Sequence, residues 1–236
     1  MTQSTLQYPS TVTTPRVQVR PLLRNVFMWM TLGLALTTLV AFVTANSPAL
    51  LNIILSPWIW GIFLAQLVLV VFLSMRVMKM SAAMATLVFL FYAALNGFTL
   101  TGVLLYYDLG TVTTAFLATA GLFGVMSLVG IFTKADLTKL GTYLFIGLIG
   151  LLIALVINIF LRSSAFDLAI SILGVLIFTG LTAYDVQKIS RMAADPQIAG
   201  QGPELMRKLS IMGALALYLD FLNLFYYLLR LFGRNR

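Results

Sequence analysis

The chain has 236 residues, of which 61% are hydrophobic and only 9% are charged. A soluble globular domain carries about 25% charged residues, and charge is costly wherever lipid replaces water. The composition therefore indicates an integral membrane protein. The net charge of +8 does not indicate nucleic-acid binding, because the basic residues stand at the ends of apolar runs. The absence of cysteine excludes disulfides and thiolate metal sites, and the absence of histidine excludes the usual catalytic dyads and an imidazole pH switch.

The first 26 residues are polar and rich in Thr, Gln and Pro. They lack the short apolar stretch and the small-residue cleavage site of a signal peptide. We expect residues 1–26 to form a disordered cytoplasmic tail that is retained in the protein. Residues 27–233 are then expected to form one transmembrane domain.

Seven apolar runs make up this domain, and each is close to the roughly 20 residues that cross the hydrocarbon core as a helix. The runs are Phe27–Asn46, Pro57–Met75, Ala82–Tyr106, Thr111–Thr133, Gly141–Leu161, Phe166–Gln187 and Leu209–Phe232. The breaks between them contain Pro, Gly, Ser or charged residues. The longest break, Lys188–Lys208, contains two prolines and two glycines and predicts a mobile loop. The sequence thus predicts an all-α membrane protein with seven transmembrane helices.

The basic residues predict the orientation of these helices. Eleven of the 15 Lys and Arg residues fall on the side of the N-terminus, which indicates that this side faces the cytoplasm. They are Arg16, Arg20, Arg24, Arg76, Lys79, Lys134, Lys139, Lys188, Arg191, Arg207 and Lys208. With seven transmembrane helices, the C-terminus lies outside. The arginines at positions 230, 234 and 236 favour instead a C-terminus on the cytoplasmic side.

Two acidic residues lie within apolar runs. Asp220 is near the middle of the last run, where a carboxylate costs about 2.5–3.5 kcal/mol on insertion scales and should face protein or a water-filled cavity. This indicates a functional group, and the alternative is a protonated side chain that bonds to a neighbouring helix. Asp185 is near the inner end of the sixth run, and it could simply pair with Lys188 three residues later. Asn223 lies one turn after Asp220 and could extend a polar lining.

No catalytic constellation is present in the sequence. There is no histidine to activate a serine, no GxxxxGK[ST] phosphate loop, and no lysine between residues 209 and 229 for a retinal Schiff base. We therefore expect neither an enzyme nor a bound cofactor.

Three motifs resemble those of the Bax inhibitor-1 family, and in particular its bacterial inner-membrane branch. They are ALYLDFLNLF at residues 216–225 with LLRLFG at 228–233, GLTAYDVQK at 180–188, and NGFTL at 96–100. The resemblance implies that six helices surround a central seventh, and that the protein is a pH-sensitive leak for calcium. In this family two aspartates share a proton, and a basic residue on the second helix latches the closed state.

The family features map onto particular residues of this chain. The resemblance implies that Asp185 and Asp220 are the proton-sharing pair and make weak, transient contacts with calcium. Two carboxylates brought together away from water cannot both ionise easily, so a shared proton is physically reasonable. Arg76 is the expected latch, or Lys79 if the alignment shifts by a few residues. Conducting relatives can have an acid within the second helix, where this chain offers only Gln66, which we expect beside Asn223 in a polar pore lining.

The sequence leaves two functions open. The first is a pH-gated leak for calcium or other cations. The second is a non-conducting regulator that binds another membrane protein such as a membrane-bound protease, with the polar N-terminal tail as its contact. In both cases the expected location is the bacterial inner membrane and the expected surroundings are the lipid bilayer.

Overall fold

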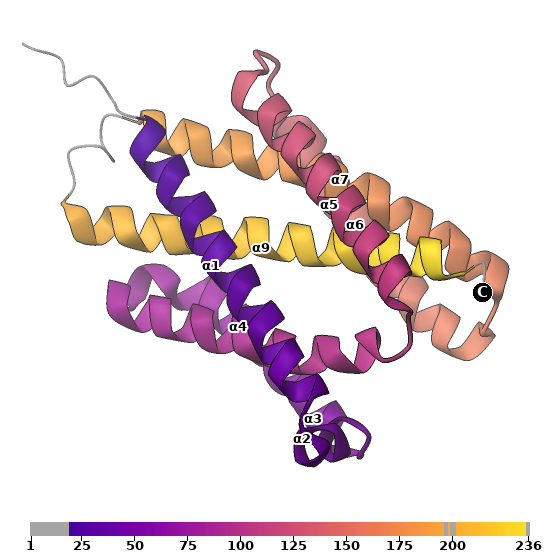
Figure 1. Cartoon of the computed structure of the whole chain (residues 1–236). Helices are drawn as coiled ribbons and strands as arrows, with labels where there is room; N and C mark the ends of the chain where they lie inside the picture. Colours follow the sequence, from indigo (N-terminus) through magenta and orange to yellow (C-terminus); the bar gives the residue numbers. More distant parts are fainter. Residues whose placement is uncertain (1–18, 196–197, 199–201, 235–236) are drawn as a thin grey trace, which may run out of the picture.

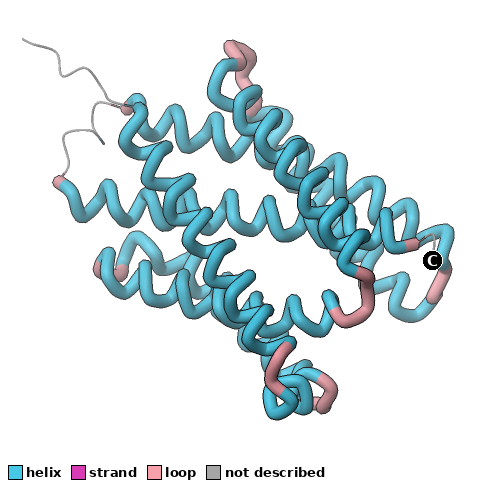
Figure 2. Tube along the Cα trace, viewed as in Figure 1, coloured by secondary structure: helices cyan, strands magenta, loops and turns pink. Residues whose placement is uncertain are grey.

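The computed structural model describes residues 19–195, 198 and 202–234, and this part of the chain is helical with no strand (Figure 2). The elements are α1 (Val19–Ala45), α2 (Pro48–Ile54), α3 (Trp58–Arg76), the 3₁₀ turn η1 (Val77–Lys79), α4 (Ala82–Leu104), α5 (Leu109–Phe132), α6 (Thr138–Leu161), α7 (Ser164–Ala194) and α9 (Pro203–Gly233). Among the described residues, seven helices are long and apolar enough to cross a membrane, and α2 is too short. The predicted all-α architecture with seven transmembrane helices is confirmed.

α9 runs through the middle of the bundle, with α1 crossing it (Figure 1). It packs against α1, α4, α5 and α7, and most of its residues between Leu209 and Leu229 are buried. α3 and α6 lie further out, since α3 packs mainly on α4 and α6 packs on α7. The expectation of a central C-terminal helix is confirmed, and α3 and α6 are its most peripheral neighbours.

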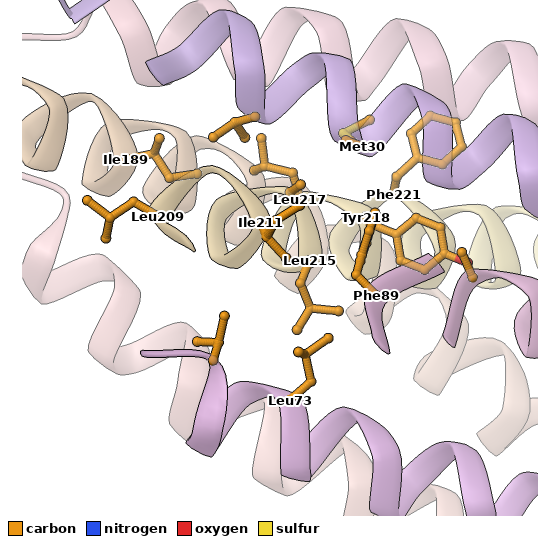
Figure 3. Close-up of a cluster of buried hydrophobic side chains, with 14 of the residues drawn as sticks. Met30, Leu73, Phe89, Ile189, Leu209, Ile211, Leu215, Leu217, Tyr218 and Phe221 are labelled. Atoms are coloured by element: carbon orange, nitrogen blue, oxygen red, sulfur yellow. The ribbon is translucent and has the colours of Figure 1, made fainter. Parts of the chain in front are cut away.

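The core consists of apolar side chains that meet α9 on several faces. Figure 3 shows Met30 from α1, Phe89 from α4 and Ile189 from α7 around the α9 residues Ile211 and Tyr218. A second cluster continues the core toward the C-terminal end of α9 and includes Leu100, Phe178 and Leu224. Two successive clusters along one helix explain how α9 stays buried over most of its length.

Glycines permit the closest helix contacts. A Cβ atom on Gly97 of α4 would lie 2.3 Å from the Thr37 carbonyl oxygen of α1. A Cβ atom on Gly130 of α5 would lie 2.5 Å from the Ala183 carbonyl oxygen of α7. Both distances are shorter than van der Waals contact, so only glycine allows these backbones to approach as they do.

Several expected boundaries are wrong. α1 begins at Val19 rather than at Phe27, because Leu22 and Val26 are buried in the core and the helix continues to bury them. The predicted disordered tail therefore does not include residues 19–26, and residues 1–18 lie outside the described part.

The long loop predicted over Lys188–Lys208 is also wrong. α7 continues to Ala194 and α9 begins at Pro203, so only residues 195–202 connect them, and residues 196–197 and 199–201 lie outside the described part. The helices extend because Ile189, Ala193 and Leu209 remain buried although charged residues surround them in the sequence. Pro203 does not interrupt a helix, because proline fits the first turn of α9.

Candidate functional site

One cavity, which we call the main cavity, has a volume of about 730 Å³ and lies between α6, α7 and α9. Each of these helices contributes residues spaced by three or four positions, which places them on one helical face. The lining includes Phe145, Leu148, Leu152 and Leu155 of α6, Phe178, Leu181, Tyr184, Asp185 and Lys188 of α7, and Met212, Ala216, Leu219, Asp220, Asn223 and Tyr227 of α9. Ser74 near the end of α3 completes the lining. The cavity is thus mainly apolar, with a few polar groups.

The main cavity brings the two predicted aspartates together. Asp185 and Asp220 come from different helices and both line it. Asp220 is only 4% exposed, and its Oδ2 atom has no hydrogen-bond partner among the described residues. Asp185 is partly buried, and Lys188 lies one turn later on the same helix, with Nζ 5.9 Å from the Tyr184 ring centroid. A carboxylate pair in a cavity at this depth can take up a proton or contact a cation.

The two predicted polar lining residues behave differently. Asn223 lines the main cavity, as expected, and its Nδ2 donates to the Leu219 carbonyl. Gln66 does not line it. Its Nε2 donates to Thr99 Oγ1 at 2.9 Å, which joins α3 to α4. The side-chain amide of Gln66 thus has its partner on the neighbouring helix, and a place for Gln66 in a pore lining stays a prediction.

The predicted latch is not formed in this structure. Arg76 and Lys79 are exposed at the ends of α3 and η1, and neither pairs with Asp185 among the described residues. Ser74 nevertheless lines the main cavity, so the end of α3 reaches its rim. A latch between Arg76 and Asp185 therefore stays a prediction about another state of the protein.

The main cavity offers several side-chain oxygen atoms. They belong to two carboxylates, the Asn223 amide and the hydroxyl groups of serine, threonine and tyrosine residues. The described residues contain no group of three or more side chains of the types His, Cys, Asp and Glu that could hold a metal ion, and calcium usually takes six to eight oxygen ligands. A weak and transient contact of Asp185 and Asp220 with a passing calcium ion stays a prediction.

Sequence reasoning missed a contact between α7 and the α5–α6 loop. The Gln187 Oε1 atom accepts from the Leu137 N–H at 2.9 Å, and Gln187 Nε2 donates to the Ala135 carbonyl at 2.8 Å. In the same loop, Asp136 pairs with Arg191 at 2.7 Å. Hydrogen bonds from the hydroxyl and N–H of Thr138, together with Arg191, lower the pKa of Asp136 to about 2. The only sequence signal was the position of Gln187, two residues after Asp185 in the motif.

The opposite end of the bundle contains a second ion pair that the sequence did not reveal. Arg230 of α9 pairs with Asp167 of α7, beside a smaller cavity of about 480 Å³. The main cavity extends along α9 only as far as Tyr227, whose ring stacks on Phe178 with centroids 5.8 Å apart. Leu228 and Leu229, which follow Tyr227, are buried. The main cavity thus ends about one helical turn before Arg230, which lines the smaller cavity.

Comparison with known proteins covers nearly the whole chain. The family model described as "Inhibitor of apoptosis-promoting Bax1" matches residues 19–236. The "Inner membrane protein YbhL" of Escherichia coli strain K12 is 43% identical over 224 residues, which are 94% of this chain and 95% of that protein. An uncharacterised protein of Deinococcus radiodurans is 43% identical over 93% of this chain and 92% of its own. An uncharacterised membrane protein of Streptococcus pyogenes is 42% identical over 75% of this chain and 74% of its own.

Proposed function

The chain belongs to the Bax inhibitor-1 family, and we propose that it forms a pH-sensitive leak for calcium or other cations across the bacterial inner membrane. The inner membrane is supported by the seven apolar helices and by the name of the Escherichia coli relative. The observation that carries the leak is that Asp185 and Asp220 line one cavity within the membrane-spanning bundle. In this proposal the protein is not an enzyme, and calcium is its cargo rather than a resident cofactor.

Proton sharing between the aspartates provides the pH sensor. Because the chain has no histidine, a coupled carboxylate pair is the group best suited to respond near neutral pH. With the shared proton in place, the pair keeps one negative charge, which attracts a cation to the middle of the membrane. Loss of the proton makes Asp185 available for an ion pair with a basic side chain.

In this proposal the latch couples the charge of Asp185 to the opening and closing of the path for cations. Arg76 stands at the end of α3, whose Ser74 lines the main cavity, so a modest movement of α3 would bring its guanidinium toward Asp185. An ionised Asp185 would hold Arg76 and close the path, and a protonated Asp185 would release it. Replacing Arg76 with Ala is then expected to raise the leak at neutral pH. If Lys79→Ala does so instead, Lys79 is the latch.

The deciding experiment is calcium entry into vesicles that contain the purified protein, measured between about pH 5 and 8, which is the range that a shifted carboxylate would cover. Asp185→Asn and Asp220→Asn should both flatten the pH profile, because neither asparagine can share a proton. Asp220→Asn should also reduce entry, since it removes the deepest negative charge. Asp136→Asn is the matched control, because Asp136 lies outside the main cavity.

Two outcomes would contradict the proposal in different ways. Equal flux and equal pH dependence in the wild-type protein and both variants would exclude the aspartate pair as the sensor. No flux from any correctly folded protein would exclude the leak itself. The second outcome favours the non-conducting regulator, and co-purification of a membrane-bound protease that is lost on deletion of residues 1–20 would then support that function.

A further inference from the structure

Two α6 residues that line the main cavity are also largely exposed. Phe145 and Leu152 line it, yet their side chains are 60% and 54% exposed on the outer face of the bundle. Both lie within the apolar part of α6, far from its ends. Among the described helices α6 packs on α7 and α3 packs on α4, and no extensive contact joins α3 to α6. Because no extensive contact joins these two helices, we expect the hydrocarbon of a surrounding bilayer to reach the cavity between them.

The chemistry of the cavity is that of an amphipathic site. Its walls are mainly leucine and phenylalanine side chains, and Asp185 and Asp220 are its acidic groups. The Asp220 Oδ2 atom is buried without a hydrogen-bond partner among the described residues. A buried acceptor without a donor is unfavourable, so an occupant that carries an N–H donor or a positive charge would be stabilised here. Water alone would not fill the apolar part of the cavity favourably.

The charged lining residues and the volume of the main cavity limit the kind of ligand that it can bind. The charged groups of the lining are Asp185, Asp220 and Lys188, and Lys188 is exposed at the end of the cavity nearest the C-terminus of α7. The lining residues of α6 carry no charge, so away from Lys188 the charged groups available to an occupant are the two carboxylates. The volume of about 730 Å³ falls within the range of about 300–1,000 Å³ that is typical of sites for small organic ligands.

We propose that the main cavity binds amphipathic amines, which enter from the bilayer between α3 and α6. The protonated nitrogen of the amine bonds to Asp220, with Asp185 as a second acceptor on the facing helix. The alkyl or aryl part lies against Leu148, Leu152 and Leu219. This binding does not depend on calcium flux, although a bound amine would occupy the position at which a cation passes.

The test uses the full-length protein in nanodiscs of phosphatidylcholine, without calcium. The probe is dodecylamine that carries a photoreactive diazirine on its chain, and labelled peptides are identified by mass spectrometry. We expect label on the α6 and α9 segments around Leu152 and Leu219. Excess dodecylamine should remove it, and excess dodecanol should not, because the alcohol carries the same chain without the charge.

Two pairs of variants locate the site. Asp220→Asn should reduce this labelling about tenfold, as expected from the loss of one charged hydrogen bond, and Asp136→Asn should leave it unchanged. Leu152→Trp keeps Asp220 and fills the cavity from α6, so it should reduce labelling as well. Ile153→Trp is its control, because Ile153 is equally exposed at 57% but does not line the cavity.

The proposal is overturned if dodecanol competes as well as dodecylamine, or if Asp220→Asn and Leu152→Trp both label like the wild-type protein. Because no ion flux is measured, its failure is distinct from failure of the leak. A protein that binds the amine but conducts no calcium would refute only the leak. A protein that conducts calcium but does not bind the amine would refute only this inference.

Discussion

The hydroxyl group of Tyr218 links three helices deep in the bundle. It lies 2.7 Å from Thr37 Oγ1 of α1, and Thr37 Oγ1 also lies 2.9 Å from the carbonyl oxygens of Gly33 in α1 and Ala93 in α4. A threonine hydroxyl has one proton, which it gives to a carbonyl, so Tyr218 is the donor to Thr37. Tyr218 thereby connects the central helix α9 to α1 two positions before Asp220, and Thr37 in turn lies within hydrogen-bond distance of α4.

Removing this hydroxyl should weaken the bundle measurably. Tyr218→Phe keeps the ring in its buried place and is expected to lower the free energy of unfolding by about 0.6–2 kcal/mol, the range for interhelical hydrogen bonds in membrane proteins. Tyr143→Phe is the control, because Tyr143 is 72% exposed. Unfolding of both variants in the same bilayer or detergent measures the difference. Equal stability of Tyr218→Phe and Tyr143→Phe would mean that the hydrogen bond contributes nothing.

Asp136 should not contribute to pH sensing in the physiological range. Its pKa is lowered to about 2 by the Thr138 hydroxyl and N–H and by Arg191. A lowered pKa means that the stabilisation of the loop is complete above the unfolded value of about 3.9 and is lost as the pH falls through about 2. We therefore expect Asp136→Asn to leave the pH profile of calcium entry between about pH 5 and 8 unchanged. A shifted profile in this variant would place part of the sensor in the α5–α6 loop.

The sequence singles out a residue most clearly where its chemistry conflicts with its surroundings. Asp220 could be identified because a carboxylate in the middle of an apolar run needs a special environment. Asp185 depended on the family resemblance, since Lys188 offered an ordinary partner. The structure does not place Gln66 beside Asn223, because a neutral amide within the membrane can be satisfied by a single neighbour such as Thr99. Which neighbour it finds depends on helix rotation, and rotation cannot be determined from one sequence without an amphipathic pattern.

At the scale of helices, packing between α5 and α7 depends on one glycine. The α5 helix contains Gly130, against which the α7 backbone packs, and also Gly124, where a Cβ atom would meet nothing within 4 Å. Gly130→Ala must push α5 away from α7 and should cost about 1–3 kcal/mol of stability, as for overpacked cores. Gly124→Ala should be neutral or slightly stabilising, because alanine favours helix by up to about 1 kcal/mol over glycine.

Thermal unfolding of the two glycine variants gives the comparison. Both changes add the same methyl group to the same helix, so their difference isolates the contact with α7. Equal unfolding temperatures would show that α5 and α7 can separate at no cost. Because Gly130 faces Ala183 and Val186, which flank Asp185 in the sequence, Gly130→Ala also reports whether a shift of α7 affects the aspartate pair.

The number and type of the helices could be predicted, whereas their ends could not. The seven apolar runs were sufficient to predict the number and type of the helices, because each transmembrane helix must cross the same thickness of hydrocarbon. The ends of α1, α7 and α9 lie beyond those runs, where mixed polar and apolar residues continue a helix on one buried face. The short helix α2 was missed for a related reason, since Pro48 reads as a break in the sequence but occupies the first turn of a helix in the structure.

At the scale of the whole molecule, the two ends of the bundle differ strongly in charge. The end that contains the start of α1, η1, the α5–α6 loop and the α7–α9 connection has nine of the basic residues whose helices are described. These are Arg24, Arg76, Lys79, Lys134, Lys139, Lys188, Arg191, Arg207 and Lys208. The opposite end has Arg162, Arg230 and Arg234, and Arg230 is neutralised by its pair with Asp167. Folding thus gathers the basic residues counted along the sequence at one end of the bundle.

This asymmetry predicts that the basic end faces the cytoplasm and that the C-terminus lies outside. Because the natural chain has no cysteine, single-cysteine variants can be labelled without background. A membrane-impermeant maleimide applied to intact cells should label Asn46→Cys and a cysteine added after Arg236, and it should label Ala135→Cys and Gly202→Cys only after the cells are made permeable. Asn46, Ala135 and Gly202 are exposed, so lack of labelling cannot come from burial within the protein.

The reverse labelling pattern would mean that the molecule has the opposite orientation, with Lys188 and the rim of the main cavity outside. Labelling of Asn46→Cys but not of the C-terminal cysteine would show instead that one of the seven helices does not cross the membrane.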